Sequence, residues 1–195
     1  IFQLHQGGLS LGQKDYYLDT DEATVHIREE YKKHIVRMFQ LVGQDEKQAT
    51  QSMEAVMEIE TRLAKKAFSA VELRNPAANY HMLTLDEVKK QIPGFDWDAY
   101  LHAVGVKGVT SMNVSQIEPV KEAVAIINEL PLEKQKAYFQ WKLIGRAAGC
   151  LSDEFVAEDF NFYGKVLSGK KEDQPRWKKA VGTVNAVLGE AVGQM

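Results

Sequence analysis

The helical spacing of its apolar residues constrains the fold of this chain more than any other feature. Tyr31, Ile35, Met38 and Val42 follow one another at intervals of 4, 3 and 4 residues, which places them on one face of a helix. Residues 46–70 have the same kind of pattern. Each run therefore predicts a long amphipathic helix that buries one face in a core.

Capping residues and Gly or Pro breaks divide the rest of the chain into further helices. Thr84 with Glu87, and Ser115 with Glu118, have the spacing of capping boxes, in which each pair satisfies free backbone N–H groups at a helix start. Only residues 106–115 have the composition of a short strand. The sequence predicts an all-α fold, an irregular multi-helix bundle of about seven helices.

Charge, hydropathy and cysteine content exclude several classes of protein. The 24 Lys and Arg residues face 27 Asp and Glu residues, so there is no basic surplus for a nucleic acid. No apolar run approaches the ~18–20 residues that span a bilayer, so we expect no transmembrane helix. The single cysteine, Cys150, rules out an internal disulfide and a multi-cysteine metal site, and its apolar neighbours predict a small core residue.

Two histidines and a carboxylate on one helix have the spacing of a metal site. His26 and His34 are eight residues apart, and Glu30 between them can share their face. A charged, solvated helix face explains the same residues, and it is the interpretation that we favour. We therefore assign neither a metal site nor a catalytic residue to this chain.

Glu60 is the most informative titratable residue because it lies on the apolar face of the helix predicted over residues 46–70. A carboxylate in that position must be paired, hydrogen-bonded or protonated. Arg74, just beyond the end of the helix, is the partner that we expect. A buried Glu60–Arg74 ion pair that fixes the turn is the main hypothesis, and a general acid or base is the alternative.

The three tryptophans are predicted to be core residues. Trp97, Trp141 and Trp177 each lie in an amphipathic helical segment. In the last segment Trp177 shares one side with Val181, Val184 and Leu188.

Several separated motifs, taken in order, resemble a known family. Residues 8–18 read Gly-Leu-Ser-Leu-Gly-Gln-Lys-Asp-Tyr-Tyr-Leu and resemble the Gly-Leu-Gly-Leu-Pro-x-Arg-x-Tyr-Tyr segment of neprilysin-type zinc metallopeptidases. Residues 56–64 are similar to that family's apolar-Glu-x-x-Leu-Ala helix, and residues 72–82 to its Arg-(Asp/Asn)-Pro…Tyr-x-x-Met element. The family includes neprilysin, the endothelin-converting enzymes and bacterial oligopeptidases.

The resemblance extends over residues 7–195. Residues 93–97 match the family's Pro-x-Phe-x-Trp turn, and residues 164–193 resemble its Leu-x-Gly…Arg-Trp…Ala-x-Gly run. Gln13 departs from the pattern, because proline is usual there. Ala180 stands where vertebrate members have a disulfide cysteine, which together with the single Cys150 resembles a bacterial member.

The family's zinc site is absent from this sequence. No His-Glu-x-x-His motif occurs, and in the family that motif lies beyond the point that corresponds to Met195. The resemblance therefore implies the N-terminal region of a zinc metalloendopeptidase, inactive alone, with zinc in the full-length enzyme and none in this chain. Its implied partners are the missing C-terminal catalytic lobe and peptide substrates, and its implied location is exported.

The resemblance also implies a domain organisation. Residues 1–112 correspond to the first part of a helical cap lobe that encloses a chamber over the zinc lobe and restricts substrate size. Residues 113–153 are expected to cross over and pack on the catalytic lobe, with crossover points at 106–115 and 152–153. Residues 154–195 would return to the cap lobe, and part of the apolar surface of residues 117–151 should be exposed in this chain.

Two other hypotheses remain open from the residues alone. The chain could be a stand-alone helical module that binds proteins or peptides without catalysis. It could also be a small hydrolase that uses Glu60 with a second carboxylate. Binding of the C-terminal portion tests the first, and activity after Glu60→Gln tests the second.

Overall fold

The computed structural model describes residues 2–194, and within them the chain forms ten α-helices and three short strands. The predicted all-α class is confirmed, because the strands have only three or four residues each. The α-helices are α1 (Asp15–Leu18), α2 (Glu22–Leu41), α3 (Glu46–Lys66), α4 (Ala70–Leu73), α5 (Leu85–Gln91), α6 (Trp97–Ala103), α7 (Ile117–Glu129), α8 (Leu132–Ala147), α9 (Asp153–Asp159) and α10 (Arg176–Gly193). Two 3-10 turns, η1 (Ala77–Asn79) and η2 (Ala148–Cys150), and a π-helical segment, η3 (Phe160–Val166), complete the list.

Side-chain caps mark the starts of α2 to α6. The Asp21 carboxylate accepts from the Thr24 backbone N–H at the start of α2. The predicted capping box of Thr84 and Glu87 is confirmed at the start of α5. The helix predicted over residues 46–70 ends earlier, at Lys66, because Ser69 caps the separate helix α4.

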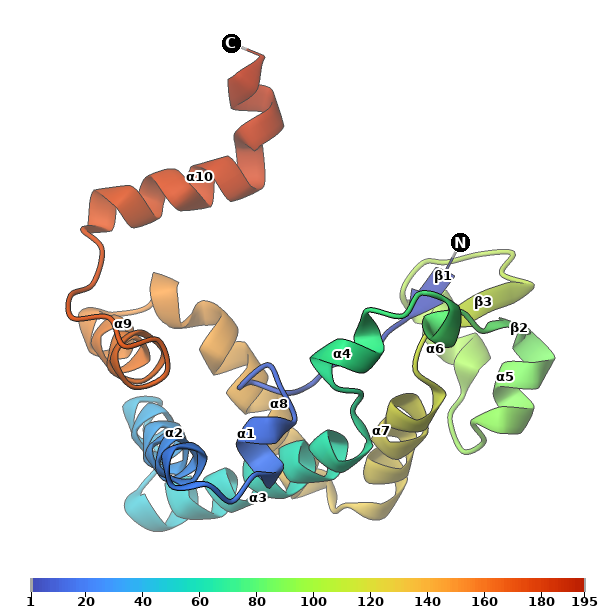
Figure 1. Cartoon of the computed structure of the whole chain (residues 1–195), viewed down its shortest axis with the longest axis horizontal. Coiled ribbons are helices and arrows are strands. Elements are labelled where there is room, and N and C mark those ends of the chain that lie inside the picture. The colour runs from blue at the N-terminus through green and yellow to red at the C-terminus, as the bar shows by residue number, and fades with distance from the viewer. Residues whose placement is uncertain (1, 195) are drawn as a thin grey trace.

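The largest apolar core lies among α1, α2, α3 and α8, which are neighbours in Figure 1. It contains the first three residues of the predicted α2 stripe, together with Trp141 of α8 and Phe162 of η3, whereas Val42 follows the end of α2 and is exposed. Residues that are far apart in sequence thus share one apolar interior. The buried members of this core are Leu11, Tyr17, Tyr31, Ile35, Met38, Phe39, Ala49, Val56, Ala64, Trp141, Ile144, Ala148 and Phe162.

The second core lies at the other end of the molecule, beneath a small sheet. The strands β1 (Phe2–Leu4), β2 (Met82–Thr84) and β3 (Ser111–Val114) have the order β1-β3-β2. β1 is parallel to β3, with Phe2 opposite Met112, and β2 is antiparallel to it, with Met82 opposite Asn113. The α5, α6 and α7 helices pack on this sheet through apolar side chains.

The predicted capping box of Ser115 and Glu118 is wrong. Gln116 is the residue before α7, and its side chain makes no cap. Its amide instead accepts from the Gln6 backbone N–H and donates to Asn79 Oδ1, while Ser115 Oγ accepts from Asn113. Bonds across the sheet edge therefore replace the local cap.

The last helix leaves the body of the molecule. The α9 helix and η3 pack against α2, whereas α10 projects away from the other helices at the left of Figure 1. None of the helices in residues 2–194 has the length and apolar character needed to cross a membrane.

Candidate functional site

Glu60 lies fully buried in the middle of α3 and accepts four hydrogen bonds. Ser10 Oγ donates to Oε1 at 2.6 Å, and Lys142 Nζ donates to the same oxygen at 3.2 Å. The phenols of Tyr17 and Tyr31 donate to Oε2 at 2.7 and 2.8 Å. We call these five residues the Glu60 cluster. Their donors occupy the four lone-pair positions of an ionised carboxylate.

The donors of the cluster are themselves held by hydrogen bonds. Ser10 Oγ accepts from Lys142 Nζ at 2.8 Å and from Trp141 Nε1 at 3.1 Å, so its one hydrogen and both its lone pairs are used. Trp141 Nε1 also lies 3.0 Å from the Tyr31 hydroxyl, which accepts. Tyr17 accepts from the Leu11 backbone N–H at 3.0 Å. The cluster therefore has no unsatisfied hydroxyl among the described residues.

Burial sets the protonation of the two phenols. Desolvation, followed by the negative charge of Glu60, raises the pKa of Tyr17 and of Tyr31 well above the usual value for tyrosine. Both phenols therefore stay protonated and remain donors at any physiological pH.

The cluster joins four separate parts of the chain. Ser10 belongs to the loop before α1, Tyr17 to α1, Tyr31 to α2 and Lys142 to α8, and all four meet on α3. A carboxylate that already accepts four bonds has no lone pair free for proton transfer. The geometry is that of a buried structural hydrogen-bond network, and it gives no support to a hydrolase that uses Glu60.

Arg74 does not take the place that the sequence predicts. It lies exposed at the end of α4, and among residues 2–194 the cation paired with Glu60 is Lys142. The reason is that α3 ends at Lys66 and the following turn carries Arg74 to the surface. Lys142 lies 82 residues from Glu60, beyond the reach of any local pattern.

The loop that carries Ser10 is shaped by a close contact at Gly8. This residue has φ of +93°, and a Cβ there would lie 2.7 Å from the Tyr138 hydroxyl and 2.8 Å from Leu63 Cδ1. The Tyr138 hydroxyl donates to the Gly8 carbonyl at 2.9 Å. A side chain at position 8 would push the loop off α3 and α8, which explains the glycine in physical terms.

The candidate metal ligands on α2 do not converge. His26 is exposed, whereas His34 is buried, stacks on Phe162 with ring centroids 4.9 Å apart, and bonds through Nδ1 to Glu158 Oε1 at 3.0 Å. His34 Nε2 is buried and has no partner in residues 2–194. In that part of the chain no group of three or more His, Cys, Asp or Glu residues could hold a metal ion.

Two predictions of burial are wrong. Cys150 is an exposed free cysteine, because η2 turns Ala148 inward and leaves the sulfur outside. Trp97 and Trp141 are core residues as predicted, but Trp177 is exposed on α10.

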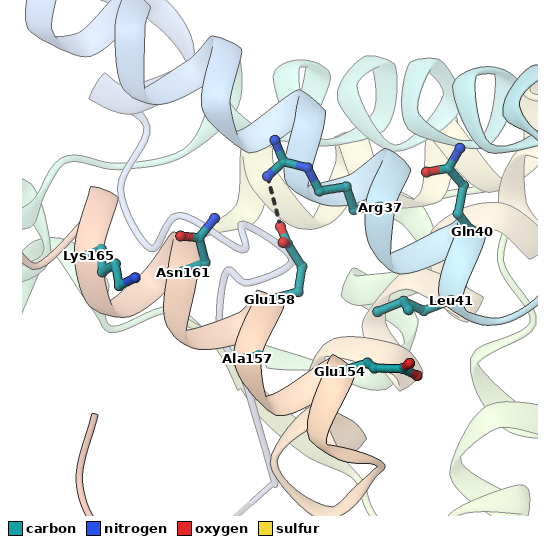
Figure 2. A pocket seen from close by; sticks show the side chains of 8 residues that line it. All are labelled: Arg37, Gln40, Leu41, Glu154, Ala157, Glu158, Asn161 and Lys165. Carbon is teal, nitrogen blue, oxygen red and sulfur yellow. Dashed lines mark hydrogen bonds and ion pairs between the residues drawn. The ribbon is translucent and has the colours of Figure 1, made fainter. Parts of the chain in front are cut away.

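Figure 2 shows a shallow open cleft of about 600 Å³ between α2 and the α9–η3 segment. Its lining carries charges of both signs: Arg37 on α2, and Glu154, Glu158 and Lys165 along the α9–η3 segment. Arg37 Nη1 already donates to Glu158 Oε1 at 3.2 Å, drawn as the dashed line. The charges of Arg37 and Glu158 are thus already used to pair the two walls of the cleft.

The predicted exposed apolar surface on residues 117–151 is confirmed. Leu132, Phe139 and Leu143 lie on the face of α8 opposite Trp141, which we call its outer face, and all three are exposed. Phe139 also lines an apolar cleft with Ile59 and Leu63 of α3. Their inner neighbours Trp141 and Ile144 are buried. The α8 helix is therefore apolar on two sides, of which only one is covered within residues 2–194.

The sequence is similar over its whole length to known peptidases. The N-terminal sequence model of Peptidase family M13 matches residues 1–195. Endothelin-converting enzyme 1 of Rattus norvegicus is 26% identical over 204 residues, which cover 100% of this chain and 26% of that enzyme. Membrane metallo-endopeptidase-like 1 of Homo sapiens is 27% identical over 214 residues, which cover 100% of this chain and 27% of that protein.

A solved structure agrees with the fold. The zinc metalloprotease Zmp1 of Mycobacterium tuberculosis, in its open state, matches 98% of this chain with a TM-score of 0.91 and 30% identity. The match covers 30% of the Zmp1 chain. The chain thus spans between a quarter and a third of the length of the proteins that it matches.

Proposed function

The chain belongs to Peptidase family M13, and on that basis we propose that it forms the N-terminal, non-catalytic helical region of a zinc-dependent endopeptidase. One observation carries the proposal: all of this chain matches the family, yet it covers only 26% of a relative such as endothelin-converting enzyme 1. The remaining part of such a protein has room for a complete catalytic site.

The residues of this chain do not fit a zinc site. His26 and His34 lie in different environments, and the sequence has no His-Glu-x-x-His motif. When bound, zinc would activate a water molecule and polarise the peptide carbonyl. We therefore assign its ligands to the part of the longer polypeptide outside residues 1–195, and we assign no catalytic residue here.

The proposed role of this region is to form one wall of an enclosed chamber and so to restrict substrates to peptides. The Glu60 cluster supports this role, because it fastens the loop at Ser10, α1, α2 and α8 to α3 through buried bonds. A region that excludes folded proteins from a chamber must keep its own helices in place when such a protein contacts it. Buried, fully satisfied polar networks make a region rigid.

We propose that residues 113–153 contact the catalytic part through the outer face of α8. The exposed Leu132, Phe139 and Leu143 support this assignment, because an apolar surface of that kind is typical of an interface. Residues 113–153 then link the two lobes, while the inner face of α8 remains part of this one.

Peptides are the proposed substrates, and an exported location in a bacterium is the proposed setting. The 30% identity to Zmp1 of Mycobacterium tuberculosis supports a bacterial origin. The word "membrane" in the name of the human relative is compatible with an enzyme that acts outside the cytoplasm.

Size selectivity tests the proposal. The longer protein that contains residues 1–195 should hydrolyse a fluorogenic peptide of about ten residues, and a chelator should abolish the reaction. A folded protein that carries the same cleavage sequence in a surface loop should resist hydrolysis. A long unfolded form of that protein should also be a poor substrate. Equal cleavage of the peptide and the folded protein would contradict the chamber.

A further inference from the structure

Two separate groups of elements in this chain each surround a core of their own. The α1, α2, α3, α8, α9 and η3 elements share the largest core, and we call them the helical unit. The β1, β2, β3, α5, α6 and α7 elements share the second core, and we call them the sheet unit. The two cores have no residue in common, and the sheet lies at the right of Figure 1, away from α2 and α9 at the left.

Within residues 2–194 the chain crosses between the two units three times. The crossings are residues 5–14, residues 67–81 and Leu130–Pro131, and we call them together the hinge. The first two are joined, because Gln6 Nε2 donates to the Phe68 carbonyl at 3.0 Å and the Phe68 N–H donates to Gln6 Oε1 at 2.7 Å. Domain rotations are usually absorbed by a few residues at the ends of elements, as in these crossings.

Between the crossings the two units meet at α3 and α7. Ile59 and Leu63 of α3 and Ile126 of α7 form a small buried cluster of their own. Beside this cluster lies an apolar cleft of about 250 Å³, lined by residues of α3, α7 and α8. Protein interiors are normally close-packed, so a cleft at this interface leaves room for the two units to shift.

One arginine joins the two units across the same interface. Arg62 of α3 donates through Nε to Glu122 Oε1 at 2.6 Å, and its Nη2 lies 2.8 Å from Glu129 Oε2, both on α7. The side chains of Arg62 and Glu129 are 26% and 60% exposed, so salt can screen the second pair. Among the ion pairs of residues 2–194, only those of Arg62 connect a helix of one unit to a helix of the other.

Structures of one relative differ in the region that corresponds to this chain. Zmp1 in complex with an inhibitor matches 98% of this chain with a TM-score of 0.92, and the open state has a TM-score of 0.91. The partially open state matches 100% of this chain with a TM-score of 0.83. All three are structures of the same protein, so this region of Zmp1 does not keep a single shape.

We propose that the two units rotate against each other about the hinge, and that the pairs of Arg62 with Glu122 and Glu129 form an ionic latch that holds the arrangement described above. The Glu60 cluster joins elements on the helical side of the hinge, so the helical unit moves as one piece. Movement at the hinge does not depend on catalysis. A failed test of the latch therefore leaves the proposed function untouched.

Distances between two spin labels in the full-length protein test the latch. With Cys150→Ser and no other reactive cysteine, labels at Gln51→Cys of α3 and Lys90→Cys of α5 report across the hinge, and both positions are exposed. Raising the salt from about 0.05 M to about 1 M should increase the population of a second distance about threefold or more, because the latch is screened. Arg62→Gln should show the second distance at low salt and should respond little to salt.

Two controls separate the latch from a general loosening of the fold. Lys134→Gln removes an ion pair with Glu58 that lies inside the helical unit, so it should leave the distances across the hinge unchanged. Labels at Gln51→Cys and Lys33→Cys, both in the helical unit, should give one distance in every variant that folds. A single distance across the hinge at all salt concentrations, a salt response that persists in Arg62→Gln, or an equal change in Lys134→Gln would overturn the proposal.

Discussion

Replacement of Glu60 by glutamine should destabilise this region strongly. The substitution keeps the shape of the side chain but turns one oxygen into an NH2 group that faces two of the four donors. Two hydrogen bonds to a charged acceptor, each worth about 1.5–3 kcal/mol, are lost, and the other two become neutral bonds of about 1 kcal/mol. Because Lys142 is 33% exposed, water can solvate its ammonium group, and the ion pair itself adds little.

The two lost bonds alone amount to a loss of about 3–6 kcal/mol in the free energy of unfolding, out of about 5–15 kcal/mol for a typical domain. With a denaturant slope of about 2–3 kcal/mol per molar urea, the midpoint should fall by about 1–3 M. Urea unfolding followed by tryptophan fluorescence measures this shift, since Trp141 is buried beside the cluster. The slope should stay the same.

Glu58→Gln is the matched control. Glu58 lies on the same helix and pairs with Lys134 of α8, but the two side chains are 39% and 43% exposed. Exposed pairs contribute about 0–1 kcal/mol, so this variant should unfold close to the wild type. A loss for Glu60→Gln no larger than that for Glu58→Gln would refute the structural role of the Glu60 cluster.

Three further predictions follow from the same structure. Gly8→Ala should lower the free energy of unfolding by about 2 kcal/mol or more in urea titrations, because of its positive φ and its close contacts, whereas Gly7→Ala, with open space around the added Cβ, should change it little; similar losses for both would contradict the contact. Burial raises the pKa of Tyr17 and Tyr31 above the unfolded value of about 10, so the protonated phenols stabilise the folded state fully below that pH. Unfolding titrations should therefore show a free energy of unfolding that falls as the pH rises above about 10. A free energy of unfolding that is flat or rising from about pH 10 to 11 would count against buried phenols. Cys150 should react with a thiol reagent in the folded protein at nearly the rate seen after denaturation, and strong protection would contradict its exposed position.

Local patterns predict the long helices well. The α2 stripe from Tyr31 to Met38 and the Thr84 capping box depend only on residues within one or two turns, and the structure confirms both. The strands β1 and β2 have three residues each, too few for alternation to be visible, and each pairs with β3 across a long stretch of chain. Neither was predicted.

For Glu60, too, the local sequence predicts the environment of the residue but not its long-range partners. That Glu60 is buried and paired follows from its place on an apolar face. Its partners do not follow, because Lys142 is brought to it only when α8 packs on α3. The prediction for Trp177 fails for a related reason: α10 is amphipathic as predicted, but the described part of this chain holds no surface that covers its apolar side.

Zinc content and peptide hydrolysis, measured together, test most directly whether this region is the non-catalytic part of a larger peptidase. The full-length protein should contain about one zinc ion per chain and hydrolyse a short peptide, and both properties should persist after His34→Gln if that variant folds. Residues 1–195 alone should have neither property. Stoichiometric zinc or peptide hydrolysis in residues 1–195 alone would contradict the account.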